Sequence, residues 1–307
     1  MQIISIIFIV IGLCLFEVVS SIDNAVINAE VLSTMSPKAK KWFLLYGILF
    51  AVFIVRGLLP WAIVWATNPS LGPIGALTAT FSNDPHIIES IEYSTPILML
   101  GGGVFLVFLF LHWLFIEDKH LGLPTEEFFL KNGAWFYAVA SIILVIIVAV
   151  SLKYNPALAL SAVIGSSAFF ITDGFKKNAE ENEQNLLNNT NQMSDISKIL
   201  YLEIIDTTFS IDGVLGAFAF TMSIPLIILG NGIGAIVVRQ ITLGSVDKIK
   251  KYVYLKNGAM YSVMCLGIIM VLEGFHIEVP EYISPLLTVL IIVYFFLKSR
   301  NYAKQSL

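Results

Sequence analysis

The sequence FEVVSSIDNAVINAE, residues 16–30, lies within an apolar stretch that begins near residue 3. Residues 3–34 are long enough to cross a bilayer as a helix, which takes about 20 apolar residues. Within them, Glu17 and Asp23 place two carboxylates where a membrane span usually has Leu, Ile or Val. Acidic side chains inside membrane helices are costly and rare, and they mark ion or proton pathways by default. The stretch therefore predicts a membrane helix with a polar site inside it.

The composition of the whole chain points the same way. Of its 307 residues, 57% are hydrophobic and 13% are charged, against about 25% charged residues in a soluble domain. The mean hydropathy is +0.83. We therefore expect an all-α membrane protein embedded in a lipid bilayer, with no nucleic-acid partner. The two cysteines, Cys14 and Cys265, lack the spacing of a disulfide framework or a zinc site.

Hydropathy predicts about nine spans, with boundaries good to about four residues. They are residues 3–34, 42–66, 93–116, 134–152, 156–172, 199–222, 225–240, 258–274 and 282–298. We expect the first to be a retained helix and not a cleaved signal peptide, because no positive region precedes it. Loops rich in Lys and Arg alternate with loops that are poor in them. Since positive loops stay in the cytoplasm, the N-terminus is expected outside and the C-terminus inside.

A hydrophilic segment, 176–198, is rich in Asn, Gln and Glu and has no aromatic residue. This composition predicts a disordered cytoplasmic linker. It divides the chain into a first transmembrane half, 1–172 with spans one to five, a linker, 173–198, and a second half, 199–307 with spans six to nine.

The acidic stretch has a second copy late in the chain. Ser210-Ile211-Asp212 repeats Ser21-Ile22-Asp23, and Asp206 matches Glu17 six residues upstream. The predicted topology gives the two copies opposite directions across the bilayer. This is typical of inverted-topology repeats, which place substrate sites near the membrane midplane where the repeats meet. We therefore expect the two copies to converge there.

Helical spacing sorts the polar residues of each copy. One face carries Glu17, Ser21, Asn24 and Asn28 in the first copy, and Glu203, Asp206, Ser210 and Gly213 in the second. Asp23 and Asp212 lie about 120° from Glu17 and Asp206 at 3.6 residues per turn. Either the helices bend or unwind near Ser-Ile-Asp and turn these acids toward the shared face, or each Asp faces a different neighbour. We favour the first, because discontinuous helices hold cations in many transporters.

The oxygen-rich side chains of the two copies suit a hard cation such as Mg²⁺, Ca²⁺ or Mn²⁺. The candidate metal ligands are Glu17, Asp23, Asn24, Glu203, Asp206 and Asp212, and the supporting residues are Ser21, Asn28, Arg56 and Ser210. Neither copy has His, Cys or Met at ligand spacing, which argues against copper and weakens zinc. Arg56, in the middle of span two, needs an acidic partner. A structural ion pair and a role in transport are both open for it.

These motifs carry a resemblance to a known family. The patterns Glu17-x2-Ser20-Ser21-x-Asp23-Asn24 and Glu203-x2-Asp206-x3-Ser210-x-Asp212 resemble the paired signature of the TerC family of integral membrane proteins, named for tellurite resistance. The chain departs from it at Gly213, where that family commonly has Ser. The resemblance implies manganese export across a bacterial cytoplasmic membrane and a role in supplying metal to exported enzymes.

The expected function is a secondary transporter that exports a divalent cation, most plausibly Mn²⁺, with protons as a natural counter-ion and no permanently bound cofactor. One alternative is a scaffold for metal homeostasis or stress response that transports nothing. Another is a different cargo, such as Ca²⁺, an organic solute or a tellurium oxyanion, the last disfavoured because carboxylates repel it. An intramembrane aspartyl protease is disfavoured, since Asp212 lacks a preceding Gly-x-Gly, and we expect no enzyme. Asn231, flanked by glycines, is a weaker pore candidate. The sequence leaves the oligomeric state open.

Overall fold

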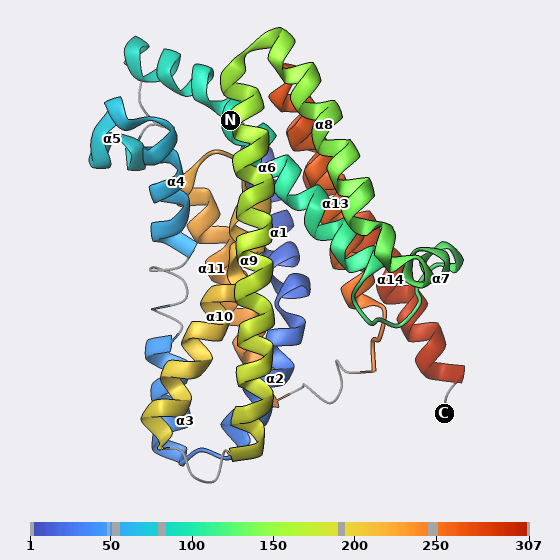
Figure 1. Cartoon of the computed structure of the whole chain (residues 1–307). Coiled ribbons are helices and arrows are strands. Elements are labelled where there is room, and N and C mark those ends of the chain that lie inside the picture. The colour runs from blue at the N-terminus through green and yellow to red at the C-terminus, as the bar shows by residue number, and fades with distance from the viewer. Residues whose placement is uncertain are drawn as a thin grey trace.

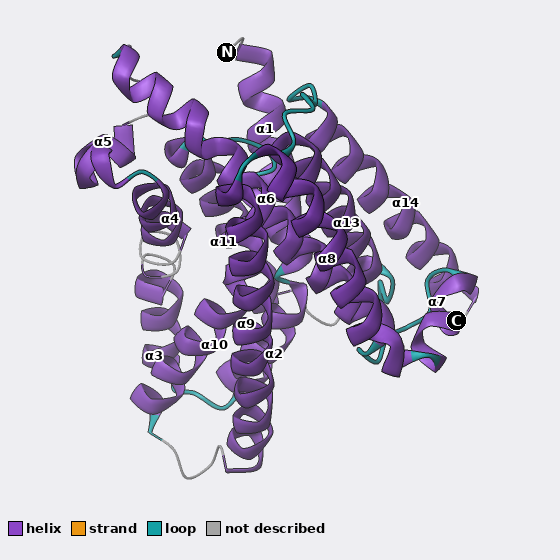
Figure 2. Cartoon of the chain, turned by 45° about the horizontal axis from the view of Figure 1, so that its top comes forward, coloured by secondary structure: helices purple, strands orange, loops and turns teal. Residues whose placement is uncertain are grey.

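The computed structural model of the chain describes residues 3–47, 50, 56–78, 84–189, 194–244 and 251–305. Within these ranges every regular element is a helix, as Figures 1 and 2 show. The expectation of an all-α membrane protein is therefore confirmed. In Figure 1 the N-terminus lies at the upper part of the bundle and the C-terminus at its lower right.

Seven described helices are long and apolar enough to cross a membrane. They are α1 (Ile3–Ser20), α6 (Pro85–Phe115), α8 (Phe136–Tyr154), α9 (Pro156–Asn189), α11 (Ile224–Gly244), α13 (Leu255–Gly274) and α14 (Ile283–Gln305). The chain is thus a multi-pass membrane protein. Shorter helices connect them at the ends of the bundle: α3 (Pro37–Trp42), α4 (Leu59–Thr67), α5 (Gly72–Thr78) and α7 (Pro124–Lys131).

Two of the nine predicted spans are not among these seven. The span predicted at 42–66 contains residues outside the described part of the chain, between a π-helical turn, Phe43–Gly47, and α4. The span predicted at 199–222 forms one continuous helix, α10 (Asp195–Ala217), but it carries five charged side chains. By length and composition the described residues thus provide seven spans, because α10 is too polar to count as one.

The first predicted span bends at the place where the acidic motif lies. It forms two helices, α1 and α2 (Ile22–Ser33), with a turn at Ser21 between them. The i to i+4 pattern nevertheless continues, since Ser21 N donates to Glu17 O and Ala25 N to Ser21 O, each at 3.0 Å. The interruption expected near Ser-Ile-Asp is confirmed as a bend in the first copy. It is wrong for the second copy, because α10 runs through Asp212 without a break.

Helix α6 forms the centre of the core. It packs against α13 and α9, and large aromatic side chains such as Trp113, Phe105 and Phe169 are buried around it. Gly101–Gly103 allow neighbouring helices to approach α6 closely. An added Cβ on Gly103 would lie 2.8 Å from the backbone nitrogen of Val271 on α13. Small residues of this kind let membrane helices pack at short distance, so α6 holds the two halves of the bundle together.

The segment expected to be disordered, 176–198, is helical over most of its described residues. Helix α9 continues through it to Asn189, and α10 begins at Asp195. Ser194 caps α10 by accepting a hydrogen bond from Ser197 N, and Asp195 accepts one from Ser36 at 2.5 Å. The polar composition was misleading because Glu, Gln and Lys are also good helix formers. The division into two halves at this segment stays a prediction.

Candidate functional site

Glu17 lies in the last turn of α1 and exposes 1% of its surface. Ser21, one turn later, donates a hydrogen bond to its Oε1 at 2.8 Å, as helical spacing predicts. Two glycines make room for the side chain: an added Cβ would lie 2.6 Å from Glu17 Cβ at Gly234 on α11, and 3.2 Å from Oε2 at Gly213 on α10. Glu17 is therefore enclosed by the first acidic motif, the second acidic motif and α11.

Arg56 connects the two acidic motifs. Its side chain is 2% exposed, its Nη2 donates to Glu17 Oε1, and its Nη1 lies 3.7 Å from Asp206 Oδ2 on α10. The prediction that Arg56 pairs with an acidic residue of the motifs is thus confirmed, and it pairs with one from each copy. Glu17 and Asp206, 189 positions apart, share one guanidinium inside the bundle. Such a group stabilises the buried negative charges only while all three members are present.

A second buried ion pair lies one turn away along α10. Glu203 Oε1 is 3.4 Å from Nη2 of Arg239 on α11, and Arg239 also donates to the backbone oxygen of Phe43 at 3.1 Å. The guanidinium stacks on the ring of Phe43, 4.2 Å from its centroid. Arg239 was not predicted as a site residue. Its place near the end of an apolar span gave no sign of an acidic partner 36 positions away.

Asp212 faces a different neighbour. Lys176 of α9 donates a hydrogen bond to its Oδ2, so the side chain lies between α9 and α10. At the next residue, Gly213, an added Cβ would meet Glu17 Oε2 at 3.2 Å. Asp212 thus sits beside the site but directs its carboxylate away from Glu17. The favoured expectation, that Asp212 turns toward the Glu17 face, is wrong in this conformation, because α10 stays regular and keeps the 120° offset. Whether Asp212 ligates a metal stays a prediction.

More charged residues lie beside this pair, and sequence reasoning missed them. His112, at the end of α6, has Nε2 3.3 Å from Asp173 Oδ1 and Nδ1 3.8 Å from Glu117 Oε1. Lys256 approaches the other oxygen of Glu117 at 3.0 Å. The only signal in the sequence was His112 itself, a single histidine in an apolar run. Single polar residues of this kind often join membrane helices through hydrogen bonds, so the histidine did not stand out. These contacts connect α6, α9 and α13.

Three predicted residues cannot be placed at the site. The side chains of Asp23, Asn24 and Ser210 lie outside the described residues. Asn28 is buried, at 4% exposure, and its Oδ1 has no hydrogen-bond partner among the described atoms. Within the described part of the chain, no three His, Cys, Asp or Glu side chains are arranged so that they could hold a metal ion. In this conformation the described acids of the site contact arginine and lysine.

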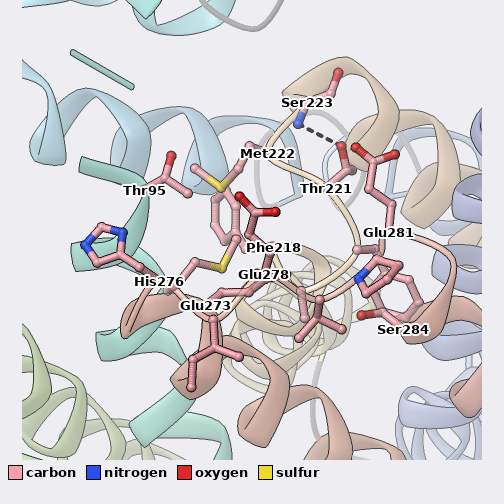
Figure 3. Close-up of a pocket in the computed structure, with 16 residues that line it drawn as sticks. Thr95, Phe218, Thr221, Met222, Ser223, Glu273, His276, Glu278, Glu281 and Ser284 are labelled. Atoms are coloured by element: carbon pink, nitrogen blue, oxygen red, sulfur yellow. Dashed lines mark hydrogen bonds between the residues drawn. The ribbon is translucent and has the colours of Figure 1, made fainter. Parts of the chain in front are cut away.

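A cavity of about 740 Å³ opens beyond the N-terminal end of α11. It is lined by the segment 218–223, by residues 273–281 after α13, and by Thr95 and Met99 of α6. Figure 3 shows three glutamates around it, Glu273, Glu278 and Glu281. Phe220 forms part of its wall, and the centroid of that ring is 5.9 Å from that of Phe16. Phe16 immediately precedes Glu17, so this aromatic pair connects the wall of the cavity with the helix that carries the buried acid.

Apolar membrane helices around internal carboxylates and arginines define a multi-pass membrane protein with a charged interior site. The chain belongs to the family described as "Protein of unknown function (DUF475)", whose profile matches residues 22–306. It is also similar to the "Uncharacterized membrane protein YceF" of Bacillus subtilis (strain 168), with 23% identity over 113 residues. That match covers 35% of this chain and 44% of the relative, so less than half of the relative's length is spanned. No solved structure matches the chain.

Proposed function

We propose that the protein is a secondary transporter for a hard divalent cation, which passes between α1 and α10. The observation that carries this proposal is the bridge from Glu17 through Arg56 to Asp206. Buried ionisable groups in membrane proteins are expensive and are usually retained for transport or signalling. Here they come from two similar motifs on two helices, which is the arrangement that holds substrate in transporters with internal repeats.

Arg56 gives this site a mechanism. The guanidinium of Arg56 now balances one of the two negative charges of Glu17 and Asp206, whereas a divalent cation in its place would balance both. Binding would therefore displace Arg56 from the acids, and release of the cation would let Arg56 return. Glu203 lies one helical turn from Asp206 and is paired with Arg239, so it would give up that pair if it joined the cation. Oxygen ligands of this kind favour Mg²⁺, Ca²⁺ and Mn²⁺.

The finer parts of the proposal rest on the resemblance to the TerC family. They are Mn²⁺ as the cargo, export from the cytoplasm and residence in a bacterial cytoplasmic membrane, whereas an N-terminus outside rests on the alternation of Lys- and Arg-rich loops. Proton exchange has a chemical basis in this site. Carboxylates that lose a cation can take up protons, which lowers the cost of keeping them in a membrane interior.

The test is cation flux into proteoliposomes that contain the purified protein, measured across Mn²⁺, Ca²⁺ and Mg²⁺ at two pH values. Glu17→Gln and Asp206→Asn should each lower Mn²⁺ flux by ~10–100-fold, the usual effect of losing a group that supports a metal site. Glu127→Gln is the matched control, because Glu127 is exposed and pairs with Lys131 outside the site. Flux equal to wild type in both site variants would reject the proposal. Absence of flux in the wild type, with normal folding, would favour a scaffold role.

A further inference from the structure

Asn231 is a buried amide that the motifs did not include. It lies on α11, its side chain is 0% exposed, and neither Oδ1 nor Nδ2 has a hydrogen-bond partner among the described atoms. The other face of α11 is exposed at Leu229, Ile233 and Ile236, so Asn231 points into the bundle. A buried polar group without partners is destabilising, and each such group in a folded protein needs an explanation.

The helix itself cannot satisfy this amide. One turn away on either side, the same face carries Ile227 and Ala235, which are both buried and apolar. The glycines beside Asn231 are used for contact with α1: an added Cβ on Gly230 would lie 2.5 Å from Leu13 Cβ. The partner of Asn231 must therefore be a small polar species that enters the bundle, such as water or a hydrated ion.

The position of Asn231 suggests which species that is. At 1.5 Å per residue, Asn231 lies ~12 Å along the chain axis from Ser223, which lines the 740 Å³ cavity, and ~4–5 Å before Gly234. Gly234 touches Glu17, and residues three apart on a helix have Cβ positions ~5–6 Å apart. Asn231 thus lies between the acidic cavity of Figure 3 and the Glu17–Arg56–Asp206 bridge.

We propose that the carboxamide of Asn231 is a ligand for the transported divalent cation, directly through Oδ1 or through the water shell of the ion, on the route between the cavity and Glu17. This inference rests on the proposed function and adds a residue that neither acidic motif contains. A neutral ligand suits an intermediate position, because conduction requires sites that bind an ion without retaining it. The amide has both a donor and an acceptor, so it can hold water on one side and the ion on the other.

The first experiment compares flux and thermal stability. Asn231→Leu should raise the KM for Mn²⁺ at least ~10-fold, in line with loss of a metal-site group, while the melting temperature in detergent stays equal or rises, because an unpaired buried amide is removed. Asn231→Ala shows whether the effect of Asn231→Leu comes from overpacking by the larger side chain. Asn231→Asp should have a KM for Mn²⁺ near or below that of wild type. The control is Ser151→Ala on α8. Like the amide of Asn231, the hydroxyl of Ser151 is fully buried and has no described hydrogen-bond partner. Wild-type KM in both Asn231→Leu and Asn231→Ala would overturn the inference.

The second experiment tests whether position 231 is accessible to water, whichever cargo the protein transports. Asn231→Cys is made in a background in which Cys14 and Cys265 are replaced by Ala, and it is treated with a small cationic thiol reagent. We expect labelling that Mn²⁺ slows, whereas Leu229→Cys, on the lipid-facing side of α11, is the reference that this polar reagent should leave unlabelled. Absence of labelling at position 231 would overturn the inference even if Glu17→Gln abolishes flux. Normal labelling with no flux in the wild type would instead reject the proposed function.

Discussion

Gly213 on α10 faces Glu17 on α1 so closely that a Cβ added to the glycine would lie 3.2 Å from Glu17 Oε2. The two residues belong to the two acidic motifs, which the sequence predicts to converge. Gly213 is also the position where the TerC pattern commonly has Ser. This close approach therefore shows what the glycine does in this chain: it lets α10 approach the carboxylate of Glu17 without an intervening side chain.

Substitutions at Gly213 should depend on whether the new side chain can donate a hydrogen bond. Gly213→Ser gains ~0.5–1 kcal/mol of helix stability, and its hydroxyl can donate to Glu17, so the melting temperature should be equal to wild type or higher. Gly213→Val has no donor and presses methyl groups against the carboxylate, which should cost ~1–3 kcal/mol through overpacking. Thermal unfolding in detergent measures both. Equal stability of the two variants would contradict this close approach.

Removal of Arg56 should be strongly destabilising. Arg56→Gln leaves Glu17 and Asp206 buried without their counter-charge, which typically costs ~3–5 kcal/mol. The double variant Arg56→Gln with Glu17→Gln removes one of these charges and should recover part of the loss. The free energy of unfolding of four proteins, wild type, Arg56→Gln, Glu17→Gln and the double variant, measured in denaturant series, checks this. Additive effects of the two substitutions would show that Arg56 and Glu17 do not interact.

The pair between Lys176 and Asp212 separates a structural role from ligation. Asp212→Asn alone leaves the ammonium of Lys176 without its carboxylate, and we expect lower stability and lower flux. Adding Lys176→Gln removes the unpaired charge, and flux should return if Asp212 acts only through this pair. Flux that stays low in a stable double variant would instead support the original assignment of Asp212 as a metal ligand. Melting temperature and Mn²⁺ flux are measured on the same preparations.

Glu117 predicts a dependence of stability on pH. Burial favours its neutral form, but the nearby His112 and the charge of Lys256 outweigh burial and lower the pKa of this carboxyl from 4.5 to about 2. A folded-state pKa below the unfolded one means stability that is present above pH ~4.5 and is lost as the pH falls toward 2. The melting temperature of wild type should therefore fall more steeply in this window than that of Glu117→Gln. Glu89→Gln, which removes an exposed carboxylate at the other end of α6, should keep the wild-type slope.

The sequence predicts much of this fold because its strongest signals are local. Runs of apolar residues give the seven long helices, and the glycine triplet at 101–103 gives the close packing of α6. The errors come from segments in which composition and structure disagree. Helix α10 carries more charged residues than the seven candidate spans allow, and the hydrophilic C-terminal part of α9 is helical because its residues favour helices as well as solvent.

The sequence predicts which acidic residues and which arginine form the site, but not all of the ion pairs between cations and acids. The repeat identified Glu17 and Asp206, and the cost of a buried arginine predicted that Arg56 pairs with such acids. Which cation meets which acid depends on helix rotation and on contacts between residues far apart in the chain. Lys176 with Asp212 and Arg239 with Glu203 are therefore visible only in three dimensions. Asn231 gave a weak signal because an amide among glycines has many uses.

Arg56 has a consequence for when such a transporter would work. A guanidinium attached to the same chain competes for Glu17 and Asp206 at a fixed and high local concentration, whereas the metal competes at its concentration in the cell. At low metal the arginine wins and the protein rests in a complete, stable state that chelators should not unfold. Only a surplus of metal would outcompete it. A carrier of this design would transport the metal only when the metal is in excess. It would need no separate sensor of the metal concentration.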